Sequence, residues 1–164
     1  MRKTLLATVL AAAALAVPAA AGLPRAGTLV PGVSLGGVRL GETEHTVRTA
    51  LGAQFGVCND CARTTWYFTY KPLQPRGLAV EFERRRVVAI YTLWKPAGWH
   101  STNGLRLGAT PLQVHRRAGE LQTITCDGYD ALVADTPSSR TAYYIFDGSL
   151  WAFGLFLPNW SPCR

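Results

Sequence analysis

The residues of this 164-residue chain that are best suited to chemistry are its four cysteines, Cys58, Cys61, Cys126 and Cys163. An even number of cysteines in an oxidising compartment predicts paired disulfides, and three pairings are possible. Cys58 and Cys61 also form a C-x-x-C motif, which in a reducing compartment indicates redox or metal chemistry. A redox pair belongs at the start of a helix, where the pKa of the thiol is lowered, whereas this pair precedes a predicted strand. The spacing of the other two cysteines is not typical of a zinc site.

Ser34 is a second candidate for chemistry, because residues 32–36 fit the G-x-S-x-G pattern of α/β-hydrolase nucleophiles. That pattern requires a buried strand of a large parallel sheet before the serine, and this chain is too short for such a fold. His45, His100 and His115 lie far apart and form no metal-binding spacing. No pair of carboxylates indicates acid–base catalysis. We therefore predict a protein that is not an enzyme and has neither a metal nor a cofactor.

The N-terminus carries the three parts of a secretory signal. Basic residues at positions 2 and 3 precede an apolar run, Thr4–Val17, and small residues follow up to Ala21. The run ends before Pro18 after 14 residues, which is short of the roughly 20 that span a bilayer. We predict cleavage after Ala21, no transmembrane anchor afterwards, and a location that is secreted, periplasmic or in the cell envelope.

The chain is basic, with a formal net charge of +7. Without Arg2 and Lys3 it would keep 15 basic against 10 acidic residues. Such a surplus suits an anionic partner, for example an acidic protein surface, an envelope polymer or lipid head groups. Nucleic acid is not expected as a partner, because export separates the two and the arginines are scattered along the sequence.

One sequence segment occurs twice. Residues 37–52 align without a gap with residues 104–119, an offset of 67 with seven identities in sixteen positions. In each copy a threonine, Thr43 or Thr110, is placed to cap the N-terminus of a short helix. Gly52 and Gly119 then supply the residue of positive φ that ends it. We expect a helix of about eight residues in each copy, held by the sheet it covers.

Strands are predicted after each helix from alternating apolar residues and from turn residues. The predicted strands are Thr64–Tyr70, Leu78–Arg84, Val87–Trp94, Ala131–Asp135, Thr141–Asp147 and Leu150–Leu157. The fold is therefore predicted to be α+β, with two tandem repeats of one or two short helices packed on an antiparallel three- to four-stranded meander. The predicted organisation is a signal peptide (1–21), an N-terminal extension (22–32), repeat 1 (33–100) and repeat 2 (101–164).

Alternation along the strands assigns the side chains to two faces of the sheet. Those expected under the helices are Trp66, Phe68, Tyr70, Leu78, Val80, Phe82, Val88, Ile90, Ala142, Tyr144, Phe146, Trp151 and Phe153. Those expected on the opposite face, which is half solvated or a docking surface, are Tyr67, Glu81, Glu83, Tyr91, Tyr143 and Phe156. Trp94 and Trp99 lie between the copies and are expected to pack the repeats together.

The twice-repeated Gly-x-x-Leu-Gly-x-Thr, followed by a short helix and a strand hairpin, resembles the tandem repeats of the β-lactamase inhibitory protein family over residues 33–157. The small-protein-A type of outer-membrane assembly lipoprotein has a similar single unit. The resemblance implies one disulfide in each repeat, Cys58–Cys61 and Cys126–Cys163, and partner binding on the exposed sheet face. The hairpin tip of that family is acidic, whereas Arg84, Arg85 and Arg86 make it basic here, which argues against a β-lactamase as the target.

The predicted function is therefore an exported, non-enzymatic binding module, inhibitor-like or an envelope scaffold, that docks a protein partner on its sheet face. The candidate binding residues are Tyr67, Arg84, Arg85, Arg86, Tyr91 and Tyr143. The three arginines could fork onto carboxylates or phosphates of a partner, or could form a solvated turn that opposes edge aggregation. The alternative function is that of an envelope-associated protein that binds an anionic polymer or lipid surface through its arginines.

Overall fold

The computed structural model describes residues 27–58, 60–71, 74–93 and 98–164. The predicted signal peptide, most of the predicted N-terminal extension and Trp94 lie outside the described residues. Within the described part of the chain, no helix is long and apolar enough to cross a membrane.

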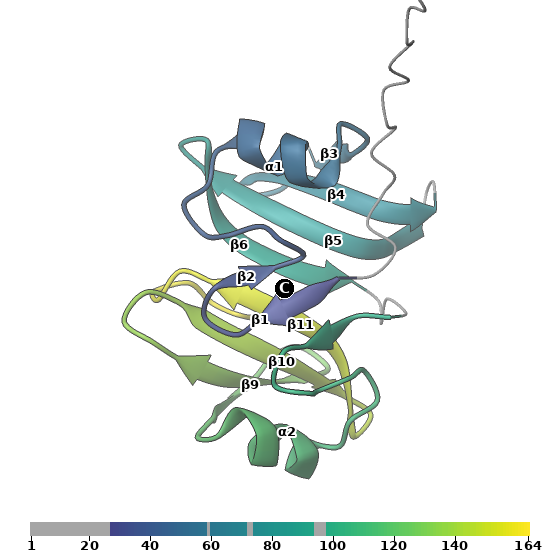
Figure 1. The fold of residues 1–164 in the computed structure, drawn as a ribbon, viewed down its shortest axis with the longest axis vertical. Helices are drawn as coiled ribbons and strands as arrows, with labels where there is room; N and C mark the ends of the chain where they lie inside the picture. The colour runs from purple at the N-terminus through teal and green to yellow at the C-terminus, as the bar shows by residue number, and fades with distance from the viewer. Residues whose placement is uncertain (1–26, 59, 72–73, 94–97) are drawn as a thin grey trace, which may run out of the picture.

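An eight-stranded antiparallel sheet forms the centre of the fold (Figure 1). Across the sheet, the strands are β3 (Gly56–Cys58), β4 (Thr64–Lys71), β5 (Gln74–Glu83), β6 (Arg86–Leu93), β11 (Ser149–Phe156), β10 (Arg140–Phe146), β9 (Asp130–Asp135) and β8 (Gln122–Thr125). The two halves of the chain meet where β6 pairs with β11, for example Ile90 with Leu155. The predicted α+β class is confirmed, and all six predicted strands are present within one or two residues of their expected ends, apart from the start of β5.

Helices α1 (Glu44–Leu51) and α2 (Pro111–Ala118) lie towards opposite ends of one face of this sheet (Figure 1). Both begin at the predicted threonine caps, whose hydroxyls accept from backbone N–H groups of Thr46 at 3.2 Å and Gln113 at 3.3 Å. Each cap satisfies one of the helix's unpaired N–H groups. A narrow stripe that includes Val47 and Val114 turns towards the sheet and is fully buried.

A second, three-stranded sheet lies between the helices on the same face. It consists of β2 (Ser34–Leu35), β1 (Thr28–Val30) and β7 (His100–Ser101), and β1 pairs in parallel with β7. The sequence did not predict this sheet, because its strands are only two or three residues long. The predicted boundaries at residues 32/33 and 100/101 both fall inside it. Trp99 is buried against the backbone of Gly27 and Gly36, where it joins the small sheet to the helix-side core.

The large sheet has apolar side chains on both faces. The helix-side core holds Trp66, Phe68, Leu78, Val80 and Phe82 from β4 and β5, as expected, together with Leu29, Leu35, Val47, Trp99 and Leu105. The side chain of Tyr70, which was also expected there, is not among those that the structure describes. We call the other face, on which neither helix lies, the open face. Its buried apolar side chains are Ala79, Ala89, Tyr91, Ala131, Val133, Ala142, Tyr144, Ala152 and Phe156.

The structure corrects the predicted faces of the second hairpin. Tyr143, expected on the open face, is fully buried in the helix-side core, whereas Ala142, Tyr144 and Trp151 lie on the open face. Phe146 was expected under the helices together with Phe82, but Ile145 lies there instead, and Phe146 is exposed beside Trp151. Since side chains alternate with a period of two, a shift of one residue moves every side chain to the other face.

A β-bulge in each hairpin explains why alternation alone fails. Tyr144 pairs with Ala152 and Ile145 with Leu150, so Trp151 is an extra residue in β11. In the other hairpin, Glu81 pairs with Ala89 and Phe82 with Val87, so Val88 is extra in β6. The extra residue has no partner on the neighbouring strand. Side chains beyond it therefore point to the opposite face from the one that simple alternation predicts.

Candidate functional site: an aromatic recess on the open face

A cavity of about 260 Å³ lies on the open face. Its lining consists of Tyr67, Tyr91, Thr92, Leu93, Tyr129, Tyr144, Trp151 and Arg164. We call it the aromatic recess. It draws on both halves of the sheet, because β4 and β6 supply one side and β10 and β11 supply the other.

The bulge in β11 places Trp151 in the recess. Its ring contacts Tyr129, with centroids 5.8 Å apart, and Tyr144, at 6.1 Å. Phe146 continues the surface at the end of β10, with its ring 6.2 Å from that of Trp151 and 56% of the residue exposed. The recess and Phe146 together form an apolar surface with phenol groups along it.

The C-terminal segment, from Leu157 onwards, brings Arg164 into one wall of the recess. The disulfide between Cys126 and Cys163 ties this segment to the sheet. The hydroxyl of Tyr144 donates to the carbonyl of Pro162 at 2.6 Å, and the hydroxyl of Tyr129 donates to the carbonyl of Arg164 at 2.7 Å. Two phenols of the recess therefore hold the backbone of this wall in place.

The side chain of Arg164 lies across the open face. Its Nε is 2.8 Å from Oε1 of Glu81, whose side chain is only 8% exposed. The guanidinium also lies 4.7 Å from the ring centroid of Phe156 and 5.5 Å from that of Tyr91. A buried carboxylate requires a positively charged partner of this kind. The faces of the two aromatic rings also attract the guanidinium cation. Arg63 approaches the same carboxylate at 4.0 Å.

Two phenols of the recess, those of Tyr91 and Tyr144, are held neutral. Burial raises the pKa of Tyr91, and the negative charge of Glu81 raises it further. Burial likewise raises the pKa of Tyr144 well above its ordinary value. A neutral phenol can donate as well as accept a hydrogen bond, so the recess combines aromatic area with polar groups that suit a peptide.

The predicted binding residues fall in three places, which are the aromatic recess, the helix-side core and the β5–β6 turn. Tyr67 and Tyr91 lie in the recess. Tyr143 lies in the helix-side core, where its hydroxyl accepts from Nδ2 of Asn103 at 3.2 Å. The sequence prediction missed Tyr129, Tyr144, Trp151 and Arg164 as members of the site. The alternation of β10 contained a signal for Tyr144, but it could be used only with the correct position of the bulge.

The three arginines of the hairpin form the β5–β6 turn, away from the recess. Two of them contact the chain around α1. Nε of Arg85 lies 3.3 Å from Oε2 of Glu44, and Nη1 of Arg86 donates to the carbonyl of Gly41 at 3.2 Å. Arg84 is exposed. Arg85 and Arg86 are exposed as well, so these contacts orient the cluster without burying it.

The other candidates for chemistry have structural surroundings. Ser34 lies in the two-residue strand β2, and the next helix begins ten residues later, so the strand–turn–helix context of a nucleophile elbow is missing. Cys58 and Cys61 are joined in a disulfide between β3 and β4, without a helix N-terminus beside them. The pairing is the one that the family resemblance implies. His45 and His115 are exposed, and the described residues contain no group of three or more potential metal ligands.

No protein-family model matches the chain, and no curated protein matches it in sequence. Two solved structures resemble its fold. One is a DUF4309 family protein, YjgB, from Bacillus subtilis, with a TM-score of 0.46, 14% identity, and coverage of 75% of this chain and 84% of that one. The other is an extracellular protein containing an SCP domain from Bacillus anthracis, with a TM-score of 0.51 and 9% identity. There the match covers 71% of this chain but only 43% of the other, and it indicates a shared fold alone.

Proposed function

We propose that this protein is an exported binding module, inhibitor-like or an envelope scaffold, that docks a protein partner on the open face of its eight-stranded sheet. The observation that carries the proposal is the aromatic recess, an apolar cavity lined by Tyr67 and Trp151 among others, with the exposed Phe146 beside Trp151. Tyrosine and tryptophan are the residues most enriched among those that dominate the energy of protein interfaces. Their polar tips let the same surface face water when no partner is bound.

The partner that fits is a protein segment with a protruding apolar or aromatic side chain. The cavity of about 260 Å³ is small for a cofactor-sized ligand but suits one such side chain. The phenols of Tyr67 and Tyr91, which are not bonded to the C-terminal backbone in the described part of the chain, can pair with backbone groups of the partner. The arginine of the wall is already paired with Glu81, so the contact is expected to depend mainly on packing and little on salt.

Export is supported by the two disulfides, which are typical of proteins that work in an oxidising compartment. We propose that residues 1–21 are the signal peptide that takes the protein there.

We also propose that the two halves of the sheet are copies of one unit, as the repeated sequence predicts. The supporting features are α1 and α2 at the same offset of 67 residues as the repeat, the sheet order β3-β4-β5-β6 facing β11-β10-β9-β8, and a bulge at the same place in each hairpin. A single unit would leave the edge of β6 unpaired. Two units pair β6 with β11 and create one broad open face.

A capture experiment tests the docking function. The exported protein, with its disulfides formed, is immobilised and exposed to secreted and envelope proteins of the cells that produce it, at low and high salt. The site variant is Tyr67→Ser with Phe146→Ser, which removes aromatic surface from the open face. The matched control is Val33→Ser with Leu112→Ser, which removes exposed apolar side chains, 48% and 59% exposed, elsewhere on the molecule.

We expect the wild type and the control to retain the partner in high salt, and the site variant to lose it. A packed aromatic interface persists when charges are screened. Equal retention by both variants would show that the open face is not the docking surface. Binding that disappears for every variant in high salt would favour a charge-driven partner instead.

A further inference from the structure

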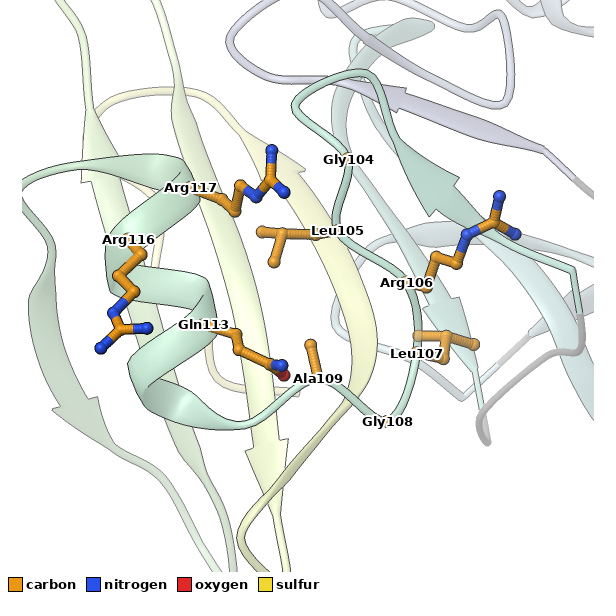
Figure 2. Close-up of a pocket in the computed structure, with 9 residues that line it drawn as sticks. All are labelled: Gly104, Leu105, Arg106, Leu107, Gly108, Ala109, Gln113, Arg116 and Arg117. Carbon is orange, nitrogen blue, oxygen red and sulfur yellow. The ribbon is translucent and has the colours of Figure 1, made fainter.

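A second recess lies on the helix side of the sheet, between α2 and the loop that leads into it (Figure 2). It has a volume of about 470 Å³. Its lining consists of Gly104, Leu105, Arg106, Leu107, Gly108, Ala109, Gln113, Arg116 and Arg117. We call it the basic recess, since three of the nine lining residues are arginines and none is acidic.

Both walls of the basic recess are fixed by hydrogen bonds. On the loop side, the N–H of Gly108 donates to the carbonyl of Leu150 at 2.7 Å, and the N–H of Leu150 donates to the carbonyl of Ala109 at 2.8 Å. On the helix side, Nδ2 of Asn103 donates to the carbonyl of Arg117 at 3.4 Å. The fold therefore holds both walls of the basic recess in place.

The polar groups of the lining are mainly donors. Arg117 points from the end of α2 towards the loop (Figure 2), and a side chain at Gly104 would lie 3.5 Å from its Nη1. Oε1 of Gln113 accepts from the N–H of Thr110 at 2.8 Å, which leaves its amide nitrogen as a donor. Arg106 and Arg116 extend to either side of the recess (Figure 2). Of the three guanidinium groups, only that of Arg117 faces the loop across the recess, and those of Arg106 and Arg116 flank the recess and point outwards (Figure 2).

None of these arginines is neutralised within the described residues. The ion pairs of the described chain involve Arg63, Arg85, Arg140 and Arg164. The nearest acidic residue along the chain, Glu120, lines a different recess beside His115 and Asp135. The three arginines at the basic recess are exposed, so their charge is directed at solvent.

We propose that the basic recess binds a linear phosphate-bearing polymer. A phosphate group offers three strong acceptor oxygens, which match the forked donors of arginine and the amide of Gln113. An extended chain of phosphates can place one group in the recess beside Arg117 and neighbouring groups at the flanking Arg106 and Arg116. A membrane surface fits less well, because Leu112 is the one large apolar side chain of α2 that the structure shows exposed, and stable insertion needs a broader apolar face.

This site goes beyond the proposed docking function and does not depend on it. The basic recess belongs to the helix side of the sheet, and the aromatic recess belongs to the open face. The molecule can then hold a polymer and a protein partner at the same time.

The test measures the affinity of the exported protein for inorganic polyphosphate by fluorescence anisotropy over a range of salt concentrations. The site variant is Arg106→Gln with Arg116→Gln and Arg117→Gln. The matched control is Arg84→Gln with Arg85→Gln and Arg86→Gln, which removes the same charge from the β5–β6 turn. Circular dichroism verifies that both variants are folded, and vesicles of phosphatidylglycerol replace the polymer in a parallel series.

We expect the site variant to lose at least about tenfold in affinity at physiological salt, and its log–log salt slope to fall by about two, as when two to three phosphate contacts are lost. The control should change affinity by less than about threefold, since it alters only the long-range field. Equal losses in both variants would overturn the site, because net charge alone would explain binding. Binding to the vesicles without binding to polyphosphate would also overturn it.

Discussion

Arg164 and Glu81 form the most buried ion pair among the described residues, with side chains 19% and 8% exposed. Removing the arginine leaves the carboxylate in an apolar setting with only Arg63, at 4.0 Å, near it. We expect Arg164→Met to lower the free energy of unfolding by about 2 kcal/mol, a partial form of the loss that follows when a buried pair is broken. Denaturant unfolding measures it.

The matched control for this pair is Arg85→Met at the exposed contact with Glu44. The side chain of Arg85 is 84% exposed, so the loss should stay below about 0.5 kcal/mol. Adding Glu81→Gln to Arg164→Met should restore part of the stability, because the unpaired charge is gone. Equal losses from the two single variants would mean that Glu81 is not effectively buried.

The buried tyrosines predict the behaviour of the protein in alkali. Burial raises the pKa of Tyr91, Tyr143 and Tyr144 in the folded state, while in the unfolded chain each should titrate near about 10. The folded state therefore holds these protons more tightly, and the resulting stability is complete below about pH 10 and declines as the pH rises further. Tyrosinate absorbance and circular dichroism, recorded together against pH, should show these three groups ionising only as the fold is lost. Ionisation of all six tyrosines near pH 10 with native circular dichroism would contradict this.

The β5–β6 turn shows how an element can carry strain at its tip. Arg84 and Arg85 have φ values of 49° and 62°, the left-handed conformation that a two-residue hairpin turn requires. Replacing them by Asn and Gly should raise the free energy of unfolding by about 1 kcal/mol, because these residues adopt positive φ more readily. Denaturant unfolding provides the measurement.

The corresponding turn of the other hairpin provides the control. Asp147 and Gly148 have φ values of 48° and 67°, so glycine already occupies the second position. Asp147→Asn should therefore change stability by less than about 0.5 kcal/mol. A loss of stability on changing Arg84 and Arg85 would instead show that the contact of Arg85 with Glu44 holds the hairpin in place.

The sequence predicted the elements with strong local signals. The caps at Thr43 and Thr110 fixed the starts of both helices, and the six longer strands followed from alternation and turn residues. The strands β1, β2, β3, β7 and β8 were missed because two to four residues carry too little pattern to identify a strand.

The recess could be predicted only in part. Tyr67 and Tyr91 follow from simple alternation, whereas Trp151 reaches the open face through a bulge that no local residue type announces. Arg164 joins the site through the Cys126–Cys163 disulfide and the contact with Glu81, and both depend on the folded sheet. Tyr143 was assigned to the wrong face because the predicted alternation along β10 was shifted by one residue.

At the scale of the whole molecule, the two disulfides should contribute differently to the free energy of unfolding. Cys126 and Cys163 are 37 residues apart, whereas Cys58 and Cys61 are 3 apart. In the chain-entropy model the longer loop contributes about 4 kcal/mol and the shorter about 2. Replacing Cys126 and Cys163 by Ser should therefore cost more in denaturant unfolding than replacing Cys58 and Cys61, and should also release the wall of the aromatic recess. The reverse order would show that the C-terminal segment holds to the sheet without its bridge.

The fold arranges two unlike surfaces on opposite sides of one sheet. The helix side carries the basic recess, and the open face carries the aromatic recess. Joining β6 to β11 makes the open face continuous across both halves of the chain. A face that is continuous across both halves suits the proposed protein partner, because stable interfaces bury roughly 800 Å² on each side.

The measurement that tests the docking face most directly is photo-cross-linking from single positions in the cells that produce the protein. A photoreactive phenylalanine analogue replaces Tyr67 or Phe146 on the open face, and Val33 or Leu112 elsewhere. We predict that positions 67 and 146 cross-link to the same partner protein and that positions 33 and 112 do not. Cross-links to that partner from positions 33 and 112, with none from positions 67 and 146, would contradict docking on the open face.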